Sequence, residues 1–169
     1  LPWLPPKLLR RLKRRETFQG ARYEIAVAAT FAHADFDIEF LHEKKHKHPE
    51  FLAKDLSGGI RIAVEAKSRH RPGVLDYPGG IDEPKALRGD VEDLLNDALR
   101  QAAGDCPFMI FVDLNVPPVP GIPLQERAWF QDVRAFMESL EEPTPDNPQD
   151  FNALFLMSFP FHWQGTNPA

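Results

Sequence analysis

The sequence predicts a single α/β domain with a mixed central β-sheet flanked by helices, in the order α-β-β-β-α-β-α-β. Three observations lead to this fold class. Segments with helical spacing of apolar residues alternate with short segments of strand character. A Gly-containing turn of hairpin length joins two of the strand segments, and a later strand segment is apolar on both faces. A chain of 169 residues is long enough to bury the core of one such domain.

Residues 1–15 are interpreted as a basic amphipathic arm, and residues 16–169 as the α/β domain. The arm has six basic residues and no acidic residue, so one interpretation is that it binds phosphate groups. The other interpretation, which is slightly favoured, is a helix that docks on a protein partner, because leucines recur at helical spacing. These leucines are Leu4, Leu8, Leu9 and Leu12.

The first helix of the domain is predicted over residues 18–32, where the apolar residues fall on one stripe. Strands are predicted to follow at residues 36–41, 50–55 and 60–67. The last two of these strands are joined by Leu56-Ser57-Gly58-Gly59, which predicts an antiparallel hairpin.

The register of this hairpin follows from the length of its turn. If the four turn residues form the loop, Asp55 pairs with Ile60, and Glu50 lies directly opposite Glu65. Because side chains alternate along a strand, Glu50, Glu65 and Lys67 then share one face, opposite to the face that packs on the core. The sequence therefore predicts that two carboxylates and one ammonium group lie together.

The rest of the chain is predicted to add a long loop, two helices and two strands. Residues 68–89 are rich in Gly, Pro and Arg and are predicted to form a flap that orders around substrate. A helix over residues 91–102, with Asp90 as its N-cap, precedes an apolar strand over residues 108–114. The domain is completed by a helix over residues 129–140 and a strand over residues 152–159.

Composition restricts the function classes. The net charge of −5 argues against a protein that coats nucleic acid. Cys106 is the only cysteine, which excludes an internal disulfide and indicates a reducing compartment. No apolar run reaches the length of a membrane span, and no signal-peptide pattern opens the chain. We therefore expect a cytoplasmic protein that makes no membrane contact.

The paired carboxylates indicate metal chemistry. Two like charges directly opposite each other destabilise a sheet, and a divalent cation between Glu50 and Glu65 would relieve the repulsion. Carboxylate oxygens suit Mg²⁺ or Mn²⁺, and Lys67 projects into the same space, where an ammonium group can stabilise charge on a phosphate. The alternative is a solvated strand face on which acidic and basic residues alternate.

A family resemblance points to the same chemistry. Pro49-Glu50, fifteen residues before Glu65-Ala66-Lys67, resembles the P-D…(D/E)-x-K motif of the restriction-endonuclease-like nucleases. The resemblance covers residues 18–114, and the order α-β-β-β-α-β predicted there is that of the family's common core. It implies that Glu50 and Glu65 are metal ligands and that Lys67 is catalytic. It also implies a catalytic acid in the first helix, which is Glu24 in this sequence.

Glu24 has support from its own surroundings. Its neighbours at helical spacing are small or apolar, so its carboxylate needs a partner, either a metal ion or Lys67. The alternative is an ion pair with an arginine such as Arg22 or Arg61.

Three further residues are candidates for substrate binding. Arg69 and Arg71 follow the motif and are interpreted as phosphate ligands, with simple solvation as the alternative. Gln101 corresponds to a Gln that some branches of the family carry in the following helix, although the Tyr expected four residues later is Asp105 here. A zinc site is disfavoured because no cysteine or second cluster completes the histidines His42, His46 and His48.

We therefore expect a nuclease that depends on Mg²⁺ or Mn²⁺ and hydrolyses phosphodiester bonds as an endo- or exonuclease, with DNA favoured over RNA as its nucleic-acid partner. The alternative is a catalytically inactive domain of the same fold that serves as a binding or scaffold module. An unrelated α/β interaction domain, in which the Glu-x-Lys pattern is a coincidence, is a third interpretation. Fold alone does not decide among the three, because one fold hosts many functions.

Overall fold

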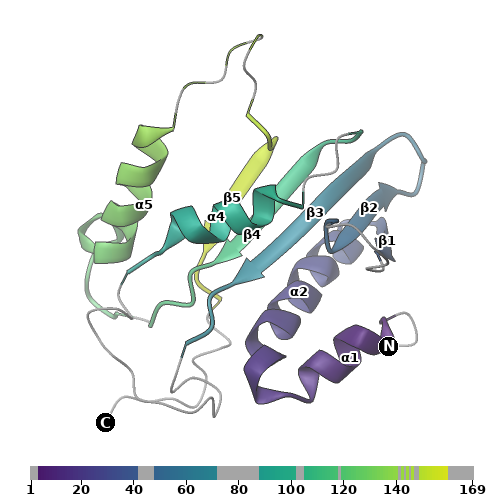
Figure 1. The fold of residues 1–169 in the computed structure, drawn as a ribbon, viewed down its shortest axis with the longest axis horizontal. Helices are drawn as coiled ribbons and strands as arrows, with labels where there is room; N and C mark the ends of the chain where they lie inside the picture. Colours follow the sequence, from purple (N-terminus) through teal and green to yellow (C-terminus); the bar gives the residue numbers. More distant parts are fainter. Residues whose placement is uncertain are drawn as a thin grey trace.

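A computed structural model describes residues 4–41, 48–71, 88–101, 105–117, 119–140, 142, 144, 146 and 149–159. In this part of the chain, five strands form one sheet in the order β1-β2-β3-β4-β5 (Figure 1). The pairs β1–β2 and β2–β3 are antiparallel, whereas β3–β4 and β4–β5 are parallel. The strands span Phe36–Phe40, Phe51–Asp55, Arg61–Ser68, Phe108–Asp113 and Ala153–Met157.

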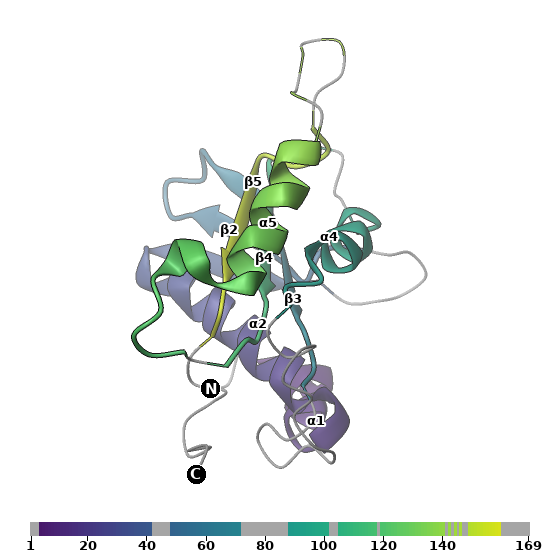
Figure 2. The same ribbon diagram turned by 90° about the vertical axis from the view of Figure 1, so that its left-hand side faces the viewer.

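Helices cover both faces of this sheet (Figure 2). One face packs on α2, and the other packs on α4 and α5. The parallel pairs β3–β4 and β4–β5 account for α4 and α5, because a chain that returns to a parallel strand crosses over a face of the sheet, and both crossovers lie over the same face. The helices are α1 (Pro6–Leu12), α2 (Arg15–His33), α4 (Val91–Leu99) and α5 (Ala128–Ser139), with a short 3-10 helix η1 (Leu124–Glu126).

The core consists of two layers of apolar side chains, one on each side of the sheet. On the α2 side, Val27 packs with Phe51 and Val64 of the hairpin strands. On the opposite side, Leu95 of α4 packs with Ile110 of β4. Because alternate residues of β3 and β4 serve the two layers, both strands are buried on both faces.

The α/β class and the mixed sheet flanked by helices are confirmed, but the order of elements differs from the predicted one. The basic arm forms a helix of its own, α1, and η1 precedes α5. The reason for the first difference is packing, because Leu4 and Leu8 are buried against Ala21 of α2. Leu4 and Leu8, two of the leucines predicted to contact a protein partner, are therefore buried within the domain, while Leu9 remains 40% exposed.

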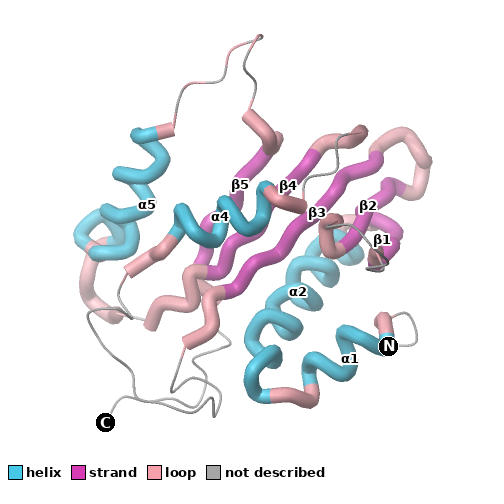
Figure 3. Tube along the Cα trace, in the orientation of Figure 1, coloured by secondary structure: helices cyan, strands magenta, loops and turns pink. Residues whose placement is uncertain are grey.

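The predicted hairpin register is confirmed. Phe51 pairs with Val64, and the Asp55 N–H donates to the Ile60 carbonyl oxygen at 3.0 Å, so residues 56–59 form the turn. Gly58 in this turn has a φ of 77°, a conformation that glycine adopts at low cost. Figure 3 shows the hairpin strands β2 and β3 beside the parallel strands β4 and β5.

Two other local predictions have different outcomes. Asp90 occupies the N-cap position of α4, as predicted, but its φ is 48° and its side chain makes no cap hydrogen bond. Its carboxylate instead forms an ion pair with Arg69. The predicted flap over residues 68–89 falls largely on residues 72–87, which lie outside the described residues. None of the described helices has the length and apolar character needed to cross a membrane.

Candidate active site

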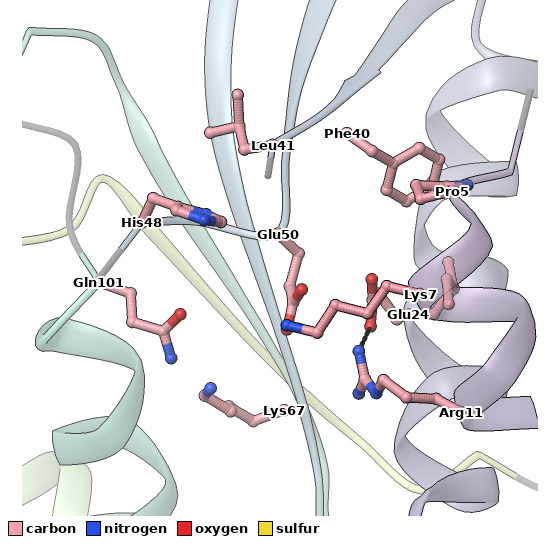
Figure 4. A pocket seen from close by; sticks show the side chains of 11 residues that line it. Pro5, Lys7, Arg11, Glu24, Phe40, Leu41, His48, Glu50, Lys67 and Gln101 are labelled. Carbon is pink, nitrogen blue, oxygen red and sulfur yellow. Dashed lines mark hydrogen bonds and ion pairs between the residues drawn. The ribbon is translucent and has the colours of Figure 1, made fainter. Parts of the chain in front are cut away.

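A pocket of about 250 Å³ lies where α1, α2 and the start of β2 meet (Figure 4). Its polar lining comes from residues that are far apart in the sequence. They include Lys7, Arg11, Glu24, Glu50, Lys67 and Gln101. Four of the seven residues that the sequence singled out for chemistry or substrate binding thus line one pocket, and a fifth, Glu65, contacts two of them, Glu50 and Lys67.

Glu50 and Glu65 are brought together by the hairpin register. Glu50 immediately precedes β2, and its backbone N–H donates to the Oε2 atom of Glu65 at 3.2 Å. Glu65 lies in the middle of β3, between β2 and β4, and has no exposed surface. The prediction that these two acidic residues lie across from each other is therefore confirmed, with Glu50 one residue outside the regular strand.

Lys67 projects from the same side of β3, two residues beyond Glu65. Its Nζ atom lies 2.6 Å from the Oε1 atom of Glu65, and its side chain is 21% exposed and lines the pocket. An ammonium group in this position is fixed by a buried carboxylate while its outer side stays open to a ligand.

Glu24 lies on α2 and lines the pocket, but its partner is Arg11, whereas Lys67, the side chain expected to pair with it, contacts Glu65. Glu24 is almost completely buried, and its Oε2 atom lies 2.5 Å from the Nη1 atom of Arg11. The arginine is not one of the two that the sequence proposed. Arg22 lies over the ring of Phe159, and Arg61 pairs with Asp105.

Burial and repulsion from Glu50 raise the pKa values of the two buried carboxyl groups, Glu24 and Glu65. Burial raises the pKa of Glu65 to about 8, Lys67 opposes the shift, and the charge of Glu50 adds to it. Burial likewise raises the pKa of Glu24 to about 8, with repulsion from Glu50 as the second cause and Arg11 as the opposing one. Glu50 therefore repels both buried carboxylates, and an additional cation at this place would lower the free energy of their ionised forms.

The donor set fits a hard divalent cation, but it is not a preassembled cage. Carboxylate oxygens from three residues are the ligands that Mg²⁺ and Mn²⁺ prefer, and the repulsion among them is what such an ion relieves. In the part of the chain that the structure describes, no group of three or more His, Cys, Asp or Glu side chains is arranged to hold a metal ion. Lys67 and Arg11 already form ion pairs with Oε1 of Glu65 and Oε2 of Glu24, at 2.6 and 2.5 Å.

Gln101 lines the same pocket although the sequence pattern around it was incomplete. Its backbone N–H donates to the Ala98 carbonyl oxygen at 2.9 Å, so a turn directly after the end of α4 brings Gln101 to the pocket. An amide in this position can donate to a phosphate oxygen or accept from a water molecule.

Arg69 and Arg71, predicted to bind phosphate, are not part of the pocket lining. Arg69 forms its ion pair with Asp90. The guanidinium of Arg71 is buried and donates to the carbonyl oxygens of Leu114, Asn115 and Arg88. Both arginines therefore have structural partners in place of the predicted phosphate contact.

Sequence reasoning missed Lys7 and Arg11 as pocket residues. It had considered the arm as a separate unit, although their spacing of four residues puts them on one side of a helix. His48 also lines the pocket, whereas the other two histidines of the disfavoured zinc site, His42 and His46, lie outside the described residues.

Comparisons of the chain with family models, with curated proteins and with solved structures found no match. The resemblance to the nuclease motif therefore depends on the residues of this chain and on their geometry.

Proposed function

We propose that the protein is a metal-dependent nuclease with a restriction-endonuclease-like core, which hydrolyses phosphodiester bonds and prefers DNA to RNA. The observation that carries the proposal is the convergence of Glu24, Glu50, Glu65 and Lys67 at one pocket from three different elements. A solvated strand face does not explain it, because Glu65 is completely buried and Glu24 nearly so.

The chain's own residues would divide the work as follows. Glu50 and Glu65 would hold Mg²⁺ or Mn²⁺, with Glu24 beside them. When bound, the ion would lower the pKa of a water molecule and offset charge on the scissile phosphate. Lys67, oriented by Glu65, would donate to the attacking water or to the phosphate as charge develops. Gln101, on the opposite wall, would orient a phosphate oxygen or that water.

The order of elements supports the same proposal. From α2 to β4 the described elements run α-β-β-β-α-β, with an antiparallel hairpin followed by a parallel strand. Glu50 lies directly before β2, and Glu65 and Lys67 lie within β3, which supports the comparison with the nuclease motif.

The second candidate, a binding or scaffold module without catalysis, is favoured by one observation. Arg11 and Lys67 already neutralise two of the buried carboxylates, so the site has charge compensation without a metal. Against it, Lys67 points into the pocket rather than away from it. A metal requirement separates the two candidates.

The test is a cleavage assay on plasmid DNA, linear DNA and RNA, with Mg²⁺, with Mn²⁺ and with chelator. We expect metal-dependent cleavage by the wild type, and a loss of about 100-fold or more in Glu65→Ala and in Lys67→Ala. Glu138→Ala, an exposed change on α5, serves as the control and should keep full activity. A folded wild type that cuts none of these substrates with either metal would refute the proposal.

A further inference from the structure

The helix α1 presents two cationic side chains to the candidate active site. Leu4 and Leu8 fix the helix against Ala21 of α2. Lys7 and Arg11, four residues apart, lie side by side on the helix surface, and both line the pocket. The helix is therefore held in place by its apolar residues, while its charged side is directed at the acidic residues.

The contacts of these two residues are with carboxylates. Arg11 lies 2.5 Å from Glu24, and its side chain is 29% exposed, so part of the guanidinium faces the open side of the pocket. In Figure 4 the ammonium group of Lys7 points towards the carboxylate of Glu50. Each cation is thus next to an acidic residue of the proposed metal site.

Charge balance shows what a metal ion would do to these contacts. When the three carboxylates of Glu24, Glu50 and Glu65 are all ionised, their negative charge is balanced by the positive charge of three cationic groups. These groups belong to Lys7, Arg11 and Lys67. A divalent cation adds an excess charge of +2 and competes with Arg11 and Lys7 for the carboxylate oxygens. Phosphate groups of a nucleic acid are the matching source of negative charge.

We propose that Lys7 and Arg11 are exchangeable cations of this site, which bind carboxylates in the free protein and the nucleic-acid phosphate once a divalent ion is bound. This rests on the proposed function and adds α1 to the machinery of the site. Arg11 is the main residue, because the planar guanidinium matches two phosphate oxygens at once. Further basic side chains extend the surface beyond α1, namely the exposed Lys13, Arg14 and Arg15.

The exchange makes the binding of metal and of nucleic acid mutually favourable. A metal ion frees Arg11 for the phosphate, and a phosphate that holds Arg11 leaves Glu24 free for the metal. By linkage, each ligand must raise the affinity for the other by the same factor. Replacing Arg11 by a neutral residue therefore has opposite effects on the two ligands, which a merely structural arginine would not produce.

The experiment compares Arg11→Gln with Arg10→Gln in the full chain. Arg10 is the matched control, because it is on the same helix, carries the same charge and is exposed outside the pocket lining. Titration calorimetry gives the Mn²⁺ affinity without nucleic acid, and fluorescence anisotropy gives the affinity for a labelled DNA duplex with Ca²⁺, under conditions where the duplex stays intact.

We expect Arg11→Gln to bind Mn²⁺ about fivefold or more tightly than the wild type and to bind DNA about fivefold or more weakly. A factor of about five is at the lower end of the range usual for coupling between two ligand-binding sites. Arg10→Gln should change the Mn²⁺ affinity less than about twofold. If Arg11→Gln binds Mn²⁺ no more tightly than the wild type, or binds DNA as well as Arg10→Gln does, the inference is overturned and the proposed function still stands. If the wild type binds no Mn²⁺ and cuts no nucleic acid, both are overturned.

A second comparison covers the case in which Arg11→Gln does not fold because Glu24 is left buried without its partner. The double variant Glu24→Gln/Arg11→Gln removes both charges and is compared with Glu24→Gln alone. The double variant should bind the duplex about fivefold more weakly. Equal affinities would overturn the role of Arg11.

Discussion

Replacing Glu65 by Gln tests the proposed metal site through protein stability, without any measurement of cleavage. Gln has nearly the same size, and its side-chain oxygen can still accept the N–H of Glu50, which donates to Glu65 at 3.2 Å. The change therefore removes one buried negative charge and leaves the hairpin contact in place. Lys67 loses its ion-pair partner, but it is 21% exposed and can reach solvent.

The expected magnitude follows from linkage. A ligand that binds only the folded state, at one hundred times its dissociation constant, adds about 2.7 kcal/mol to the free energy of unfolding. In a domain of this size each kcal/mol raises Tm by about 3 °C, so saturating Mn²⁺ should raise the Tm of the wild type by about 8 °C. Glu65→Gln should reduce this shift to less than about 2 °C, because one of the two proposed ligands is missing.

The assay is thermal unfolding followed by circular dichroism at pH 8, with Mn²⁺ and with chelator. In chelator, Glu65→Gln should melt no lower than the wild type, because burial and repulsion from Glu50 disfavour the charge that it removes. Glu138→Gln, an exposed change of the same kind, should keep the full metal shift. A wild type that melts at the same temperature in both buffers, or a Glu65→Gln variant that keeps the shift, would refute the reasoning.

Two further predictions concern pH and the docking of α1. The pKa values of Glu24 and Glu65 are raised from 4.5 to about 8 in the fold, so the folded state binds more protons than the unfolded chain between these values. The free energy of unfolding without metal should therefore fall as pH rises from 4.5 to about 8, which urea denaturation at several pH values measures. Glu65→Gln should make this fall with pH smaller. A free energy of unfolding that stays constant or rises over this range would contradict the prediction. Leu8→Ala should loosen α1 by about 2 kcal/mol, so that amide hydrogen exchange in α1 becomes about 30-fold faster. Leu9→Ala, at a 40% exposed position, should leave the exchange nearly unchanged, and equal effects of the two changes would argue against the packing described.

The parts of the site that depend on local periodicity could be predicted from the sequence. The hairpin turn and the alternation of side chains fixed the pairing of Phe51 with Val64, and with it the proximity of Glu50 to Glu65. The small and apolar neighbours of Glu24 at helical spacing correctly indicated that its carboxylate is buried. Each of these inferences needs only the geometry of one element or of one tight turn.

The parts that depend on tertiary packing could not be predicted in this way. The leucine stripe of the arm showed that α1 has an apolar side, but not that α2 covers it, and so the ion pair of Arg11 with Glu24 was missed. Arg71 was assigned to substrate because it follows the motif in sequence. The chain turns after β3, and this residue is buried among backbone carbonyl groups.

The contacts of Arg71 also have a consequence for engineering. Its guanidinium donates to the carbonyl oxygen of Arg88 at 2.9 Å, and its backbone N–H donates to the side chain of Gln19 at 2.9 Å. Both ends of the segment between residues 71 and 88 are therefore anchored next to each other by one side chain. Because the closing entropy of a loop grows only slowly with its length, extra residues placed between fixed ends cost little. A fluorescent reporter or an affinity tag inserted between these two anchored ends is therefore expected to leave the sheet intact.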